Sequence, residues 1–146
     1  MRRVVSVILF IVGGWLLCSE VVMAWINAGQ GIVGQLDIAA FVAVLAIPFL
    51  FLGMWASPGN RFADVGLTVM LAVGVGAAVA LMMVLIFNDP GARQLMPPDK
   101  PMPDMHFAYV LGAVNTGALG GAGWLLWWFG KSRERAAETS LEEVFD

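Results

Sequence analysis

Four long apolar stretches occupy most of this chain, and every charged residue except Glu20 lies outside them. The stretches cover residues 4–26, 38–55, 65–87 and 107–129. An α-helix rises about 1.5 Å per residue, so roughly 20 residues cross the hydrocarbon core of a bilayer, which is about 30 Å thick. The sequence therefore predicts an all-α polytopic membrane protein in which residues 1–130 form four antiparallel transmembrane helices.

The composition excludes several classes of protein. Only 13% of the 146 residues are charged, about half the share in a typical soluble domain. No basic patch is present, so we expect no binding to nucleic acid. The single cysteine, Cys18, lies inside the first stretch, so an intrachain disulfide is impossible. No nucleophile has a neighbouring base, and the apolar stretches contain no pair of carboxylates, so the chain is expected not to be an enzyme.

The basic residues predict the orientation in the membrane. With the N-terminus in the cytoplasm, most of the basic residues fall on the cytoplasmic side, as is usual for short loops. The chain is thus expected in a bacterial-type inner (plasma) membrane, with both termini cytoplasmic. The cytoplasmic set is Arg2, Arg3, Arg61, Lys131, Arg133 and Arg135, and the outer set is Arg93 and Lys100.

The N-terminus has an alternative interpretation. Two arginines followed by an apolar run resemble a signal peptide, and Val22-Met23-Ala24 fits a small-residue cleavage rule loosely. Cleavage there would leave three spans in the same orientation.

Local signals at the helix ends give two further expectations. Asp64 is a residue type that caps helix starts, so it is expected to cap the third helix. Trp25 ends the first apolar stretch, and tryptophan is common at the membrane–water interface. We therefore expect Trp25 in the outer interfacial belt.

Glu20 is the candidate for chemistry inside the membrane. It falls on one line with Ser6 and Gly13, at intervals of seven residues, and such a line packs against other helices. Asn115 and Thr116 lie at a comparable depth in the fourth stretch, so the three residues form a predicted intramembrane polar site. Glu20 then serves either as a proton or cation relay or as a protonated structural acid.

Small residues on the stretches predict where helices approach closely, because glycine lets two backbones come together. Gly13 lies on the polar line of the first stretch, and Gly76 is one of several small residues in the third. Gly112 and Gly120 form part of a small-residue face on the fourth.

The proline-rich outer connection contains a candidate metal site. Met96, Met102, Met105 and His106 supply thioethers and an imidazole, which are soft ligands that suit Cu(I). The alternatives are that methionine, common throughout this chain, fills apolar space, and that the lone histidine is a simple interfacial residue.

Residues 131–146 form an acidic cytoplasmic tail with helical composition. Leu141, Val144 and Phe145 share a narrow apolar stripe that could dock a partner protein, because the surrounding acids would be repelled by anionic lipid. The alternative is a frayed tail.

Three functions remain open on these observations. The favoured one is a small non-enzymatic integral membrane subunit or accessory protein of a larger inner-membrane complex, which contacts lipid and other membrane subunits and could form a homo-oligomer. The second is a small oligomeric transporter or channel that uses Glu20. The third is the handling of Cu(I) on the outer side, and no other cofactor is expected.

Overall fold

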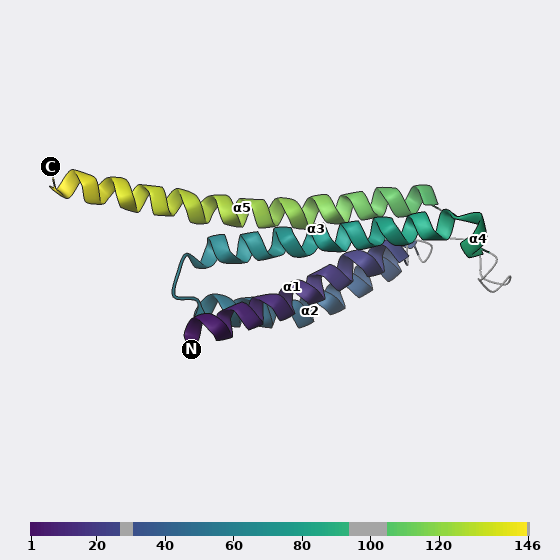
Figure 1. Cartoon of the computed structure of the whole chain (residues 1–146), viewed down its shortest axis with the longest axis horizontal. Helices are drawn as coiled ribbons and strands as arrows, with labels where there is room; N and C mark the ends of the chain where they lie inside the picture. Colours follow the sequence, from purple (N-terminus) through teal and green to yellow (C-terminus); the bar gives the residue numbers. More distant parts are fainter. Residues whose placement is uncertain (27–30, 94–104, 146) are drawn as a thin grey trace.

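Helices account for nearly all of the part of the chain that the structure describes. The computed structural model describes residues 1–26, 31–93 and 105–145, and these contain no strand. The predicted all-helical architecture is confirmed (Figure 1). The elements are α1 (Arg2–Ile26), α2 (Gly31–Ala56), α3 (Arg61–Asn88), the single turn α4 (Pro90–Arg93) and α5 (Met105–Phe145).

Three helices are long and apolar enough to cross a membrane, which supports the expectation of a membrane protein. Their apolar segments are Arg2–Ile26, Leu36–Ala56 and Arg61–Ile86. The second is 21 residues long, against the 18 expected from the sequence. The fourth expected span, residues 107–129, lies within α5 and is less apolar, because it contains five glycines besides Asn115 and Thr116.

The long helices pack as two pairs, α1 with α2 and α3 with α5. In the first pair, Ser6 Oγ donates a hydrogen bond of 2.9 Å to the Gly53 carbonyl, and a Cβ on Gly13 would press on Leu50. Residue numbers therefore rise along α1 and fall along α2. The contact of α1 with α3 joins the pairs. The pairs diverge toward the end of the molecule where both chain termini lie (Figure 1).

The α3–α5 pair is held by contacts between backbones. A Cβ on Gly66 would collide with the backbone of Gly123 and Trp127, and one on Gly130 would collide with the backbone of Ala63. At this end, Asn60 Nδ2 donates a hydrogen bond of 2.6 Å to the Gly130 carbonyl. These glycines let α5 approach α3 more closely than larger residues allow.

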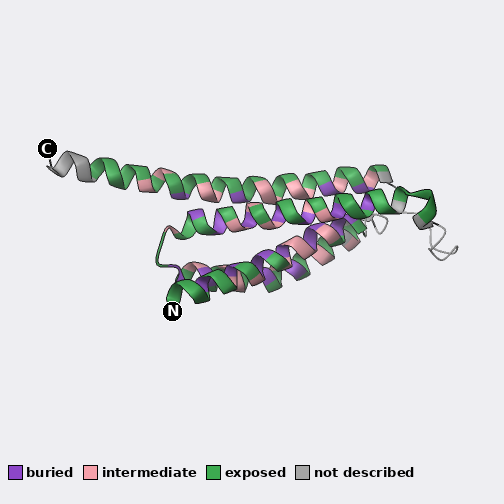
Figure 2. Cartoon of the chain, viewed as in Figure 1, coloured by how far each residue is buried: buried purple, intermediate pink, exposed green. Residues whose placement is uncertain are grey.

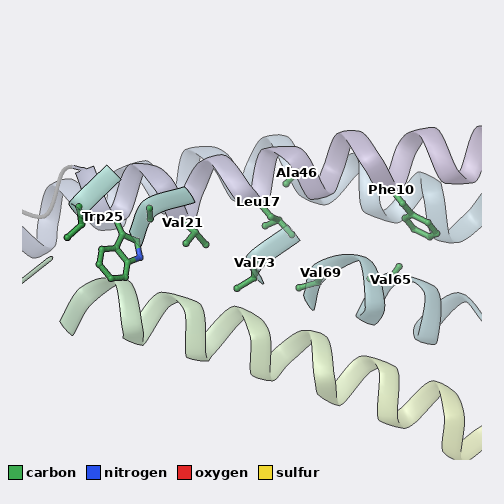
Figure 3. Packing of buried hydrophobic residues seen from close by; sticks show 10 residues of the cluster. Phe10, Leu17, Val21, Trp25, Ala46, Val65, Val69 and Val73 are labelled. Atoms are coloured by element: carbon green, nitrogen blue, oxygen red, sulfur yellow. The ribbon is translucent and has the colours of Figure 1, made fainter. Parts of the chain in front are cut away.

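The core lies between α1 and α3. Trp25, at one end of the core, reaches α5 (Figure 3). All four long helices carry many exposed residues (Figure 2), and a large share of these are large apolar side chains. Such an apolar surface is what helices surrounded by lipid tails present. The buried core residues are Phe10, Leu17, Val21, Trp25, Ala46, Val65, Val69, Val73, Ala80 and Val84.

One local expectation is wrong. The cap of α3 is Asn60, whose side-chain oxygen accepts from the Ala63 amide at 3.3 Å, whereas Asp64 lies inside the first turn. Trp25 is buried, because its indole stacks edge-on against Tyr109, with ring centroids 5.6 Å apart, and covers Gly112. Its place in the outer interfacial belt stays a prediction, and the structure adds that this tryptophan also packs against α5.

Candidate functional site

Glu20 lies in the interior of the bundle, with 7% of its surface exposed. Its predicted line-mates Ser6 and Gly13 both contact α2, so this face of α1 is turned toward α2. Glu20 Oε2 is buried and has no hydrogen-bond partner among the described residues. A buried polar atom in this condition costs free energy, so it marks a place where a function or a bound species has to be considered.

Asn115 and Thr116 lie on α5, which contacts α1 through Trp25, on a different face of α1 from Ser6 and Gly13. Trp25 covers Gly112, so one helical turn further along each antiparallel helix brings Thr116 to the level of Val21. Asn115 and Thr116 are half-buried, and no hydrogen bond between described residues joins either of them to Glu20. The structure therefore gives the three residues a similar depth but places them on two helix interfaces.

Two more buried polar atoms without partners lie where α1 meets α5. They are Trp25 Nε1 and Thr116 Oγ1, and neither atom has a hydrogen-bond partner among the described residues. An indole N–H can only donate, whereas a threonine hydroxyl can donate and accept. The bundle interior thus offers unsatisfied donors at the α1–α5 contact and an unsatisfied carboxyl oxygen on Glu20.

The glycines singled out from the sequence lie at helix contacts of different closeness. Gly13 faces Leu50 on α2, and Gly76 on α3 faces the Cys18 carbonyl, 3.0 Å from an added Cβ. Gly112 lies under the Trp25 ring, while Gly120 has room, with its nearest contact 4.0 Å away on Val73. The small-residue face predicted on the fourth stretch also includes Gly123, which meets the Gly66 carbonyl, whereas sequence reasoning missed Gly66 and Gly130, where backbones meet most closely.

A groove between α1 and α3 was not expected from the sequence. It has a volume of about 670 Å³ and lies at the end where the two helix pairs diverge. Its wall on α1 extends from Arg3 to Cys18, and its wall on α3 extends from Asp64 to Val75. The α2–α3 turn at residues 57–59 closes the end of the groove near the helix starts.

The hydroxyl groups around the groove are already used within the protein. Ser6 bonds the Gly53 carbonyl, Thr68 Oγ1 donates to the Asp64 carbonyl at 2.8 Å, and Ser57 Oγ donates to the Asp64 carboxylate at 2.9 Å. The remaining lining is mostly aliphatic and aromatic. The groove therefore combines an apolar channel with two charged groups, Arg3 and Asp64, near one end.

The predicted copper site lies mostly outside the described residues. Met96 and Met102 fall in the undescribed segment 94–104, and the side chain of Met105, the first residue of α5, is likewise not described. His106 follows in the first turn of α5 and is exposed. Among the described residues, no group of three or more His, Cys, Asp or Glu side chains could hold a metal ion.

The tail continues α5 without a break. The Lys131 ammonium pairs with the Glu134 carboxylate at 2.7 Å, and hydrogen bonds from Lys131 and Asn60 lower the pKa of Glu134. Arg133 lies over the Phe62 ring, 5.7 Å from its centre. Beyond Glu134, every side chain described, at positions 135–140, is exposed. Leu141, Val144 and Phe145, the residues of the predicted docking stripe, lie in the last turns of α5, and their side chains are outside the described part.

Comparison with protein families, with curated proteins and with solved structures found no match for this chain.

Proposed function

We propose that this protein is a small, non-enzymatic integral membrane subunit or accessory protein of a larger inner-membrane complex, and that the end of α5 is its docking arm. The observation that carries the proposal is the length of α5, a single helix of 41 residues whose last part extends past the bundle (Figure 1). An exposed helix that contacts nothing in its own chain gains stability when a partner covers its apolar stripe. The partner is a protein, because acidic residues on the arm would be repelled by anionic lipid.

The proposed topology has four spans, with both termini in the cytoplasm. The support for α5 as the fourth span is its contact with α3, which extends from the Ala63–Gly130 contact to beyond the Val69–Gly123 contact. A helix packed along a transmembrane neighbour shares its depth in the bilayer. The basic residues at the cytoplasmic ends add the usual charge asymmetry.

Reporter fusions test this topology. Fusions after Asn60 and after Asp146 should both report the cytoplasm, and a fusion near Pro98 should report the outer side, because four spans return the chain to its starting side. A cytoplasmic signal near Pro98, or an outer signal after Asp146, would overturn the assignment.

Truncation tests the docking arm. Deleting residues 135–146 should leave the bundle folded, because positions 135–140 are exposed and the Lys131–Glu134 pair is kept. The partner that co-purifies with the full chain in mild detergent should then be lost. The double variant Leu141→Ala/Phe145→Ala should reproduce this loss, whereas the neighbouring Glu142→Ala/Glu143→Ala should retain the partner. Unchanged co-purification after the deletion would refute the proposal.

A second candidate function is that of a small oligomeric transporter or channel, in which several copies of the chain assemble and Glu20 carries a proton or cation. The observation that favours it is the buried Glu20 Oε2 without a partner among the described residues. Ionisable side chains inside membrane spans commonly belong to ion or proton pathways. The variants Glu20→Gln and Glu20→Leu separate this function from a structural role of Glu20.

A further inference from the structure

The groove between α1 and α3 has the length of one leaflet of a bilayer. Its wall on α3, from Asp64 to Val75, is about 16 Å long, and its wall on α1, from Arg3 to Cys18, is about 22 Å long. Half of the hydrocarbon core is roughly 15 Å. The charged groups lie near the helix starts, and the apolar lining continues from them toward the middle of the spans. This is the layout of a headgroup followed by an acyl chain.

The two charged groups are complementary to a zwitterion. Arg3 and Asp64 line the same groove, and no ion pair joins these two described residues. An arginine fork binds phosphate oxygens in pairs, and a carboxylate accepts hydrogen bonds from an ammonium group. Asp64 would repel a headgroup that carries phosphate alone, so the pair favours a headgroup with both charges. The carboxylate can accept hydrogen bonds only from an ammonium group that carries hydrogens, which a quaternary ammonium does not.

The rim of the groove favours a lipid over another helix. Trp15 and Leu71, which line it, are 67% and 62% exposed, and Val7 and Ile11 are also exposed. Helices in membranes approach each other through small residues, whereas large, flexible apolar side chains adapt to an acyl chain. The volume of about 670 Å³ falls within the roughly 300–1,000 Å³ of small-molecule sites.

We propose that this groove binds one phosphatidylethanolamine molecule. One acyl chain lies between α1 and α3, the lipid phosphate pairs with Arg3, and the ammonium group pairs with Asp64. No residue of α5 lines the groove, so the lipid site is separate from the proposed docking arm and a test of one proposal does not decide the other.

The headgroup contacts are tested by counting bound lipid. The full chain is reconstituted in nanodiscs of phosphatidylcholine with a minor share of phosphatidylethanolamine, then released into mild detergent and examined by native mass spectrometry. One retained phosphatidylethanolamine per chain is expected. Arg3→Gln should lower this retention by about tenfold, the effect of losing a charge-assisted hydrogen bond. Arg2→Gln is the matched control, because Arg2 does not line the groove, and it should retain the lipid.

The acyl-chain channel is tested by filling it. Val75→Trp places a large ring in the groove and should abolish retention, whereas Val44→Trp, at an exposed position on α2 outside the groove, should not. Asp64→Asn keeps an oxygen that can accept from Ser57 but removes the charge, so the preference for phosphatidylethanolamine over phosphatidylglycerol should disappear. If Val75→Trp does not fold, the comparison of Arg3→Gln with Arg2→Gln still tests whether the groove binds the lipid.

Several outcomes would overturn the proposal. One is equal retention by the Arg3→Gln and Arg2→Gln variants. Another is retention of phosphatidylglycerol as strong as that of phosphatidylethanolamine in the unmodified chain. A third is cross-linking of the Ile11→Cys variant to a second copy or to another polypeptide, which would identify a protein as the occupant of the groove.

Discussion

Gly66→Ala is expected to lower the free energy of unfolding by about 2–3 kcal/mol, at the upper end of the usual cost of overpacking. The added methyl group would meet the backbone of Gly123 and Trp127, which cannot rotate away as a side chain can. The helices α3 and α5 would have to separate along their contact. The measurement is the unfolding of the purified protein by increasing SDS in mixed micelles, followed by circular dichroism.

Gly74→Ala is the matched control, on the same helix and a little over two turns further along. Nothing lies within 4 Å of an added Cβ there. Because alanine has the higher helix propensity, this variant should be neutral or more stable by up to about 1 kcal/mol. The same contrast is expected on α5 between Gly123→Ala, which is crowded, and Gly121→Ala, which is open. Equal effects at the crowded and open positions would contradict the close α3–α5 contact.

Glu20→Leu is expected to raise the free energy of unfolding by about 1–3 kcal/mol, the cost of burying a polar group without a hydrogen bond. Glu20 Oε2 has no partner among the described residues, so removing it leaves no other atom orphaned. The sequence alone predicts a harmful effect instead, because Asn115 would lose its hydrogen-bond partner. In the structure the face of α1 that carries Glu20 is turned toward α2 and not toward α5, so this reason no longer applies. SDS titration measures the change, with Ser19→Ala, on an adjacent and less buried position, as the control.

Glu20→Gln separates a structural role from transport. It keeps the shape and the hydrogen-bonding capacity of the side chain but removes the ionisable proton. If Glu20 is structural, both variants should keep normal co-purification of partners and show no functional loss. If it is a relay, proton or cation flux into liposomes that contain only this protein should disappear with Glu20→Gln while folding stays normal. Destabilisation by Glu20→Leu would contradict the absence of a partner for Oε2.

The class of protein and its helices follow from the sequence because the apolar stretches are long and nearly free of charge. The predicted stretches at residues 4–26 and 65–87 agree with the apolar segments Arg2–Ile26 and Arg61–Ile86 to within a few residues. The structure extends each segment to its terminal arginine, because backbone hydrogen bonding continues where hydropathy ends. The class of protein and the extent of its apolar helices therefore depend only on local composition.

The faces that meet could not be predicted in the same way. Lipid tails are as apolar as leucine, so hydrophobicity does not tell an interface from a lipid-facing surface. Trp25 illustrates this, because its place near a span end does not reveal that it is buried, which depends on Gly112, 87 positions later in the chain. Glu20 and Asn115 match in depth, yet the rotation of each helix about its axis decides whether they meet.

The groove depends on the angle between the helix pairs, which no local pattern encodes. Arg3 and Asp64 are 61 positions apart and share a site only because α1 and α3 start at the same end of the molecule. Opposite charges at the starts of two apolar stretches are a weak signal that could have drawn attention to them. The divergence of the helix pairs toward that end could not be predicted from the sequence.

Because α5 is one unbroken helix, the directions in which its two halves present their side chains are fixed relative to each other. The half that packs on α3 through Gly123 and Gly130 and the half that projects beyond the bundle belong to one helix, with no hinge between them. Each residue of an α-helix turns the chain by about 100°. One residue inserted near Arg135 would therefore point the apolar stripe of the arm in another direction, while seven would restore its direction to within about 20° and lengthen the arm by about 10 Å. The bundle thus sets the direction from which the proposed partner would have to approach.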